Sequence, residues 1–179
     1  MKLSDGEKLI FLMLADIYKN LKIKNGEFDP NFVSNTIFHD HLWGFNWRYH
    51  SIPFEDSEQP PEVSETADIL DMWWLVERAY EKLSPAGKTK IKDATGRSEV
   101  EFIGFDGNNE NHFGIARYLV EDPGRFEYFK GRNLNSHSRV IEGYRRMCRV
   151  FEPIRKHLAN RSLNADELIE ILNATRHPQ

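Results

Sequence analysis

The stretch VIEGYRRMCRVFEPIRKHL, from Val140 to Leu158, decides the fold class of this chain. Its apolar residues recur at steps of one, three or four, which is the spacing of a helix that packs one face on a core. These residues are Val140, Ile141, Tyr144, Met147, Cys148, Phe151, Ile154 and Leu158. Because proline lacks an amide hydrogen and clashes with the preceding turn, Pro153 predicts a kink or a junction of two helices near Glu152.

Helical signals continue on both sides of this stretch. In the segment 163–174, Asn164 and Glu167 have the spacing of a capping box, and Ser4 and Glu7 repeat that signal near the N-terminus. The first helix then carries its apolar face on Leu9, Ile10, Met13, Leu14, Ile17 and Leu21. Two capped helices at the ends of the chain favour a helical fold.

The middle of the chain adds two further helices. Asp29 followed by Pro30 is a helix start, and the apolar pattern after it extends to Phe45. A longer helix is predicted over 62–83. The fold class is therefore all-α: a compact multihelical domain over residues 1–179. A short pairing of two strands, near 100–103 and 125–129, is compatible with the alternation of apolar residues there.

The composition agrees with one folded domain. The chain has 179 residues and 40% hydrophobic content, enough for a sizeable core. Its single cysteine excludes an internal disulfide framework, and the apolar run 9–14 is too short to span a bilayer. No signal peptide is recognised, so we expect a cytoplasmic protein without membrane contact. The acidic, proline-rich segment 51–61 is predicted to be a mobile loop.

Several motifs resemble a known family. They are Phe102-Ile103-Gly104-Phe105-Asp106, Gly114-Ile115-Ala116-Arg117-Tyr118-Leu119-Val120, Gly124-Arg125-Phe126, Tyr144-Arg145-Arg146-Met147 and the segment 163–174. Together they resemble the YfbU family of bacterial proteins. The resemblance implies an all-helical fold but transfers no mechanism, because the biochemical role of the family is uncharacterised. The chain departs from the family pattern mainly between Gly26 and Pro61.

Charge is distributed unevenly. Residues 125–161 hold 10 Lys and Arg against 3 acids, whereas the remainder holds 14 against 25. The candidates for contact with phosphate or with a partner are Arg117, Arg125, Arg139, Arg145, Arg146 and Arg149. Glu142 and Glu152 have the spacing to pair with helix arginines, so a solvated helix face is one interpretation. Self-association through complementary charges and nucleic-acid contact are the others.

Histidines and tryptophans cluster between residues 39 and 50. On a helix, His39 and His41 would point to nearly opposite sides, so a shared metal ion is not expected, although His50 is a conceivable distant ligand. Trp43 and Trp47 share a helix face and are candidates for a surface aromatic patch at an interface. We predict no metal and no cofactor.

The remaining residues that could take part in binding or catalysis are given structural interpretations. Asp106 alternates with nearby polar residues as the first ligands of a calcium-binding loop do. However, the glycine and the glutamate that such a loop requires are missing. Asp106 and Arg117 are instead predicted to cap a helix and to form a buried ion pair. Cys148 lies on an apolar face and is interpreted as a small hydrophobic residue. Gly87 precedes a Lys-Thr pair, but no strand precedes it, so no P-loop is predicted.

Two functional hypotheses follow. The first is a non-catalytic helical protein that assembles with itself or with another protein. The alternative is an RNA- or phosphate-directed binding protein or hydrolase that holds phosphate with its arginines and uses His39 or His137 as acid or base. The alternative lacks a paired-carboxylate or metal-ligand signature, so we assign no catalytic residue and do not expect an enzyme.

Overall fold

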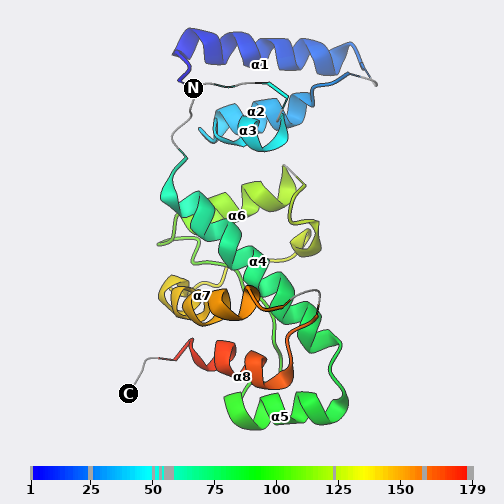
Figure 1. Cartoon of the computed structure of the whole chain (residues 1–179). Coiled ribbons are helices and arrows are strands. Elements are labelled where there is room, and N and C mark those ends of the chain that lie inside the picture. The colour runs from blue at the N-terminus through cyan, green and yellow to red at the C-terminus, as the bar shows by residue number, and fades with distance from the viewer. Residues whose placement is uncertain are drawn as a thin grey trace. The chain divides into compact units, whose positions relative to one another are not determined.

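The computed structural model describes residues 2–23, 26–49, 51–52, 54, 59–122, 124–158 and 161–176. Within these residues the chain forms eight α-helices and one 3-10 helix, so the all-α prediction is confirmed (Figure 1). The elements are α1 (Asp5–Asn20), α2 (Pro30–Phe38), α3 (Gly44–Arg48), α4 (Pro61–Glu81), α5 (Pro85–Thr95), α6 (His112–Glu121), η1 (Glu127–Phe129), α7 (Ile141–Arg155) and α8 (Ala165–Asn173).

The chain divides into two compact units, and the division falls within α6. Unit 1 contains Met1–Pro60 and Tyr118–Arg125, and unit 2 contains Pro61–Arg117 and Phe126–Gln179. The expectation that residues 1–179 form one domain stays a prediction. Five residues of the predicted mobile loop 51–61, namely 53 and 55–58, lie outside the described residues, so its mobility stays a prediction.

Unit 1 is built on aromatic packing. α1 packs against α2, and α2 contacts α3. Phe32 of α2 is buried against Phe45 of α3 and Tyr118 of α6, with ring centroids 5.9 and 6.1 Å apart. The Tyr118 hydroxyl forms a buried hydrogen bond of 2.6 Å with Thr36, and burial raises the pKa of Tyr118. This contact joins segments 82 residues apart in the sequence.

The helix that starts after Asp29 is shorter than predicted. The Asp29 carboxylate accepts hydrogen bonds from two amides of the first turn, as expected for an N-cap. However, α2 ends at Phe38 and α3 begins only at Gly44, so the prediction of one continuous helix to Phe45 is wrong. Asp40 has a φ of 55°, in the left-handed region, which a continuing helix does not allow. The chain therefore turns at Asp40.

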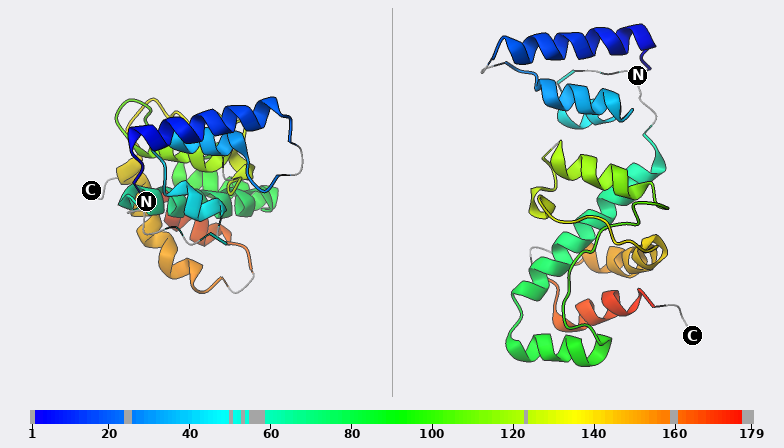
Figure 2. Two further views of the ribbon diagram at one scale, coloured as in Figure 1. Left: turned by 90° about the horizontal axis from the view of Figure 1, so that it is seen from above. Right: turned by 180° about the vertical axis from the view of Figure 1, so that it is seen from behind.

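Unit 2 is organised around α4. This helix buries ten residues, including Ile69, Leu70 and Val76, each with no exposed surface. α7 and α8 both contact α4, and α5 packs on α8, as the two opposite views show (Figures 1 and 2). α7 continues through Pro153 to Arg155, so the predicted junction of two helices near Glu152 is absent.

An extended segment between α5 and α6 completes the core of unit 2. Gly104 has a φ of 86°, and a side chain there would collide with the backbone of Leu134. The Phe105 amide donates to the Leu134 carbonyl at 2.9 Å, and a single parallel bridge joins Phe105 to Asn135. The described residues form no strand pairing between 100–103 and 125–129, because 127–129 form η1.

Candidate functional site

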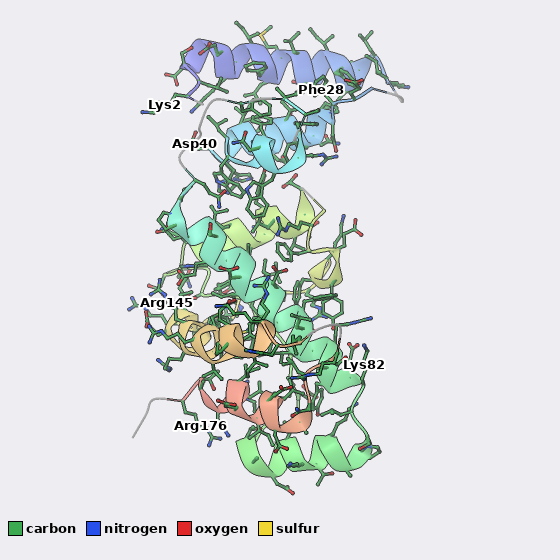
Figure 3. The ribbon with its side chains drawn as sticks, viewed as in Figure 1. Lys2, Phe28, Asp40, Lys82, Arg145 and Arg176 are labelled. Carbon is green, nitrogen blue, oxygen red and sulfur yellow. The ribbon has the colours of Figure 1, made fainter. Side chains whose placement is uncertain are left out.

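The first helix carries apolar side chains on two opposite sides. On the side facing α2, Ala15 is buried and Leu12 is half-buried. The opposite side, which we call the outer face of α1, consists of Leu9, Ile10, Met13, Leu14, Ile17 and Leu21. These six residues are between 52% and 67% exposed. Figure 3 shows the row of side chains that stands away from α2 on this helix.

The spacing along the outer face is that of a helix-pairing seam. Ile10, Leu14, Ile17 and Leu21 follow one another at steps of four, three and four. This is the alternation of the two core positions in a coiled coil, where such residues insert between those of a facing helix. The outer face thus has the residue spacing found in pairs of packed helices.

An apolar groove lies beside this face within unit 1. It has a volume of about 310 Å³, and almost all of its lining is apolar. The lining includes Phe11, Leu14, Val33, Phe45, Tyr49 and Phe54. Leu14 belongs to both the groove and the outer face, so the two apolar surfaces are continuous. Contiguous apolar surface of this kind marks interaction sites in folded proteins.

The ends of α1 carry opposite charges. Asp5 and Glu7 lie in the first turn, and Lys19 lies in the last turn. Ser4 caps the helix and forms a reciprocal capping box with Glu7, which lowers the pKa of that carboxyl group through hydrogen bonds. This arrangement complements the helix dipole and leaves the helix acidic at one end and basic at the other.

The two candidate interface tryptophans do not form a surface patch. Trp43 is only 4% exposed and packs against Tyr118, with ring centroids 5.2 Å apart, so its predicted surface position is wrong. Trp47 is half-buried. Its indole nitrogen donates to Gln59, and the Arg125 guanidinium lies 4.7 Å from its ring centroid. Both rings pack against residues of unit 1. Trp43 points inward because the chain turns after the end of α2.

His39 and His41 lie closer together than helical geometry predicts. Because α2 ends before them, their rings stack with centroids 6.0 Å apart. His41 also packs on Tyr118, and burial lowers the pKa of His41. His50 lies outside the described residues. Among the described residues, no group of three or more His, Cys, Asp or Glu has the geometry to hold a metal ion.

Arg145 belongs to an ionic cluster in unit 2. It donates to Glu65 at 2.6 and 2.9 Å and to Glu142 at 2.5 Å, so the predicted pairing with Glu142 is present. His112, buried against Phe105, lies 2.7 Å from Glu65 Oε2, the oxygen that also accepts from Arg145. Hydrogen bonds from Arg145 are the main reason that the pKa of Glu65 falls to about 2. The charge of Arg145 is therefore already balanced.

The remaining arginines of this region have different surroundings. Arg146 donates to the carbonyls of Ala174 and Thr175 at the end of α8. Arg139 makes one long hydrogen bond of 3.5 Å to Asn109. Arg149 is exposed, and Glu152 pairs with Arg155 instead of Arg149. Arg139 and Arg146 line a common cavity, and Arg149 lies outside it.

Arg117 and Asp106 do not form the predicted ion pair. Asp106 is buried, and hydrogen bonds from Asn108 and Asn109 lower the pKa of its carboxyl group. Arg117 is exposed and lies over the ring of Phe113 at 5.7 Å. Asp106 therefore stabilises its own turn, as a capping residue does.

Cys148 and His137 show no catalytic arrangement. The Cys148 thiol is half-buried beside the Met72 sulfur, and burial raises its pKa to about 12. His137 is exposed in a turn with a φ of 54°, where its amide donates to Asn135. The unreactive interpretation of Cys148 agrees with this environment.

Sequence reasoning missed two features of unit 2. One is the cluster of Glu65 with His112 and Arg145, whose members lie up to 80 residues apart. The other is Arg97, which joins Arg139 and Arg146 in the cavity. No local pattern marks either feature, because the contacts depend on how the helices pack.

Comparison with known proteins identifies a family. The sequence profile of the YfbU domain matches residues 1–174. Neither the curated proteins nor the solved structures contain a match. Within the described part of the chain, every helix is too short or too polar to cross a membrane.

Proposed function

The chain belongs to the YfbU family, and we propose that it is a non-catalytic protein that assembles with a second copy of itself through the outer face of α1. The observation that carries this proposal is a row of six large apolar residues, each at least 52% exposed. Water contact with such a row is unfavourable, and burial against an identical row removes it on both copies.

The area of the outer face is sufficient for a dimer. At roughly 180 Å² for a fully exposed Leu, Ile or Met, the six residues present on the order of 600 Å², the upper end for the largest patch on a monomer. A standard interface buries about 800 Å² per partner. The adjoining groove supplies further apolar surface, so pairing of two α1 helices reaches this class of interface.

The helix dipole of α1 favours an antiparallel pair. A two-fold axis across the outer face brings the first turn of one helix beside the last turn of the other. The two helix dipoles then oppose each other. Lys19 donates to Ser34 of α2 and lies on the other side of α1, so its charge does not take part in this pairing. A parallel pair would instead place like ends of the two dipoles together, so the antiparallel direction is the favoured one.

The alternative of RNA or other phosphate-directed chemistry has weaker support. The charge of Arg145 is balanced by Glu65 and Glu142, so this arginine of α7 is not available to a nucleic-acid strand. Arg125 stacks on Trp47 in unit 1. The net charge of −4 also opposes the approach of a polyanion.

Sedimentation velocity over a range of concentrations tests the proposal. Wild-type protein should sediment as a dimer that dissociates on dilution. Ile17→Glu should weaken the dimer by roughly 100-fold or more, because the two-fold axis buries two unpaired carboxylates. Ile103→Glu is the matched control, since Ile103 is also 52% exposed but lies in unit 2.

Folding of the variants is checked by circular dichroism. Leu9→Glu provides a second disruption of the outer face, should Ile17→Glu lose its helical spectrum. A wild-type protein that stays monomeric at every concentration would refute the proposal. Equal weakening by Ile17→Glu and Ile103→Glu would also refute it, because it would place the interface elsewhere.

A further inference from the structure

A cavity in unit 2 gathers three arginines from separate segments. Its volume is about 360 Å³. Arg97 follows α5, Arg139 precedes α7, and Arg146 lies within α7. Trp73 of α4 and Thr175 after α8 line the same cavity. Packing thus brings several hydrogen-bond donors to one concave site, which is the general form of a small-ligand site.

The three guanidinium groups have neutral partners. Arg97 donates to the Thr175 hydroxyl at 2.9 Å, and Arg146 donates to the carbonyl of the same residue at 2.6 Å. Arg139 reaches only the Asn109 side chain, at 3.5 Å. Among the residues that the structure describes, no carboxylate forms an ion pair with any of these arginines. No described carboxylate therefore contacts these three guanidinium groups directly, and Asp106 acts on Arg139 only as a nearby charge.

Burial makes the lack of a directly contacting carboxylate costly at Arg97. Arg97 is half-buried, and its burial is the main reason that the pKa of its guanidinium is lowered. The neighbouring charge of Arg176 acts in the same direction, since like charges disfavour each other. A bound anion would offset both effects. The site therefore gains more from an anion than an exposed arginine cluster does.

Donor capacity remains after the internal hydrogen bonds are made. A guanidinium carries five N–H donors. The structure uses one of these in Arg97 and two in Arg146. The indole nitrogen of Trp73 is buried and has no hydrogen-bond partner among the described residues. Tetrahedral oxyanions accept hydrogen bonds from several directions and suit the remaining guanidinium donors.

Two acidic residues limit the size and charge of the ligand. Glu142 and Glu101 also line the cavity. Glu142 is held by Arg145 at 2.5 Å, and Glu101 is 60% exposed at 3.9 Å from Arg132. Their carboxylates repel a long polyanion but leave the arginines available to one compact anionic group. A nucleic-acid strand fits this charge pattern poorly.

We propose that the cavity lined by Arg97, Arg139 and Arg146 binds the phosphate group of a small phosphate monoester. The arginines hold the phosphate oxygens through charge-assisted hydrogen bonds, and the rest of the cavity accommodates the ester substituent. This site lies within unit 2 and does not depend on self-assembly through α1.

Isothermal titration calorimetry of the full chain tests this site, with ribose 5-phosphate, inorganic phosphate and acetate as probes at one ionic strength. Ribose 5-phosphate should bind most tightly. Arg139→Gln should weaken its binding by roughly tenfold or more, as expected for the loss of a charge-assisted contact. Arg149→Gln is the matched control, because it removes the same charge from an exposed position outside the cavity.

The other outcomes would overturn the proposal. They are no binding of ribose 5-phosphate to wild-type protein, equal weakening by both variants, and binding of acetate or inorganic phosphate as tight as that of the ester. Thermal unfolding without ligand serves as the check on folding. Arg139 is exposed and makes only one long hydrogen bond, so its replacement should leave the unfolding temperature unchanged.

Discussion

Helices α1 and α4 are both rich in apolar residues, yet they use them in opposite ways. α4 buries ten residues, and Leu70 among them has no exposed surface. α1 buries only Ala15, while Leu9 is 62% exposed. An apolar side chain stabilises a fold only when folding removes it from water. The difference indicates that α4 maintains the core of unit 2, whereas the outer face of α1 stays exposed to solvent in the described chain.

The largest expected effect is in the core of unit 2. Leu70→Ala should lower the free energy of unfolding by about 2–5 kcal/mol, because it removes buried methyl groups and leaves a cavity. Urea denaturation followed by circular dichroism measures this change. A loss smaller than about 1 kcal/mol would contradict the central role assigned to α4.

A smaller loss should follow removal of the charge on Glu65. Glu65→Gln should cost about 2 kcal/mol at neutral pH, because hydrogen bonds from Arg145 and His112 lose their charged acceptor. Chemical denaturation at pH 7 measures the loss. Glu62→Gln, one turn earlier on α4, is the control for a change of charge on this helix.

The pH dependence of stability tests the contribution of the Glu65 charge in a second way. The pKa of Glu65 is lowered in the folded protein to about 2, from an ordinary value of 4.5. Its contribution is therefore complete above pH 4.5 and is lost as the pH falls toward 2. In Glu65→Gln the decline over this window should be shallower than in wild type. Thermal unfolding at about pH 4.5 and pH 3 measures the two declines. An equal fall in unfolding temperature for wild type and Glu65→Gln between these pH values would contradict the prediction.

The two capping boxes offer a matched comparison of the units. Asn164→Ala at α8 should destabilise unit 2 by about 1 kcal/mol, because two amides of the first turn lose their acceptor. Ser4→Ala at α1 should have a smaller effect on unfolding of the monomer, since α1 buries little. Hydrogen exchange at the first turn of each helix measures both. Equal global destabilisation would weaken the contrast between α1 and α8.

The smallest effect should come from Leu9, an exposed leucine of α1. Leu9→Ala should change the free energy of unfolding of the monomer by less than about 0.5 kcal/mol. At concentrations where the protein is a dimer, the same variant should unfold at a lower temperature than wild type. Thermal unfolding at low and high protein concentration separates the two contributions. A large loss in the monomer would show that Leu9 belongs to the core.

Local sequence signals located most of the helices. The capping boxes at Ser4 and Asn164 are present as predicted, because cap and acceptor lie within one turn of chain. The signals failed where a single backbone angle decided the outcome. Asp40 adopts a left-handed conformation, so one predicted helix became two and Trp43 turned into the core. Pro153 is accommodated within α7 near its end.

The sequence by itself determined the all-α class, the family and the apolar row along α1, because each depends on residues that are neighbours in the chain. Only the tertiary structure decided which apolar face stays open, that Arg145 is balanced by Glu65, and that Arg97 meets Arg139 and Arg146. Helical periodicity shows that a helix has an apolar face but not which segment covers that face. Burial and charge pairing depend on contacts between distant segments, and these form only when the helices pack.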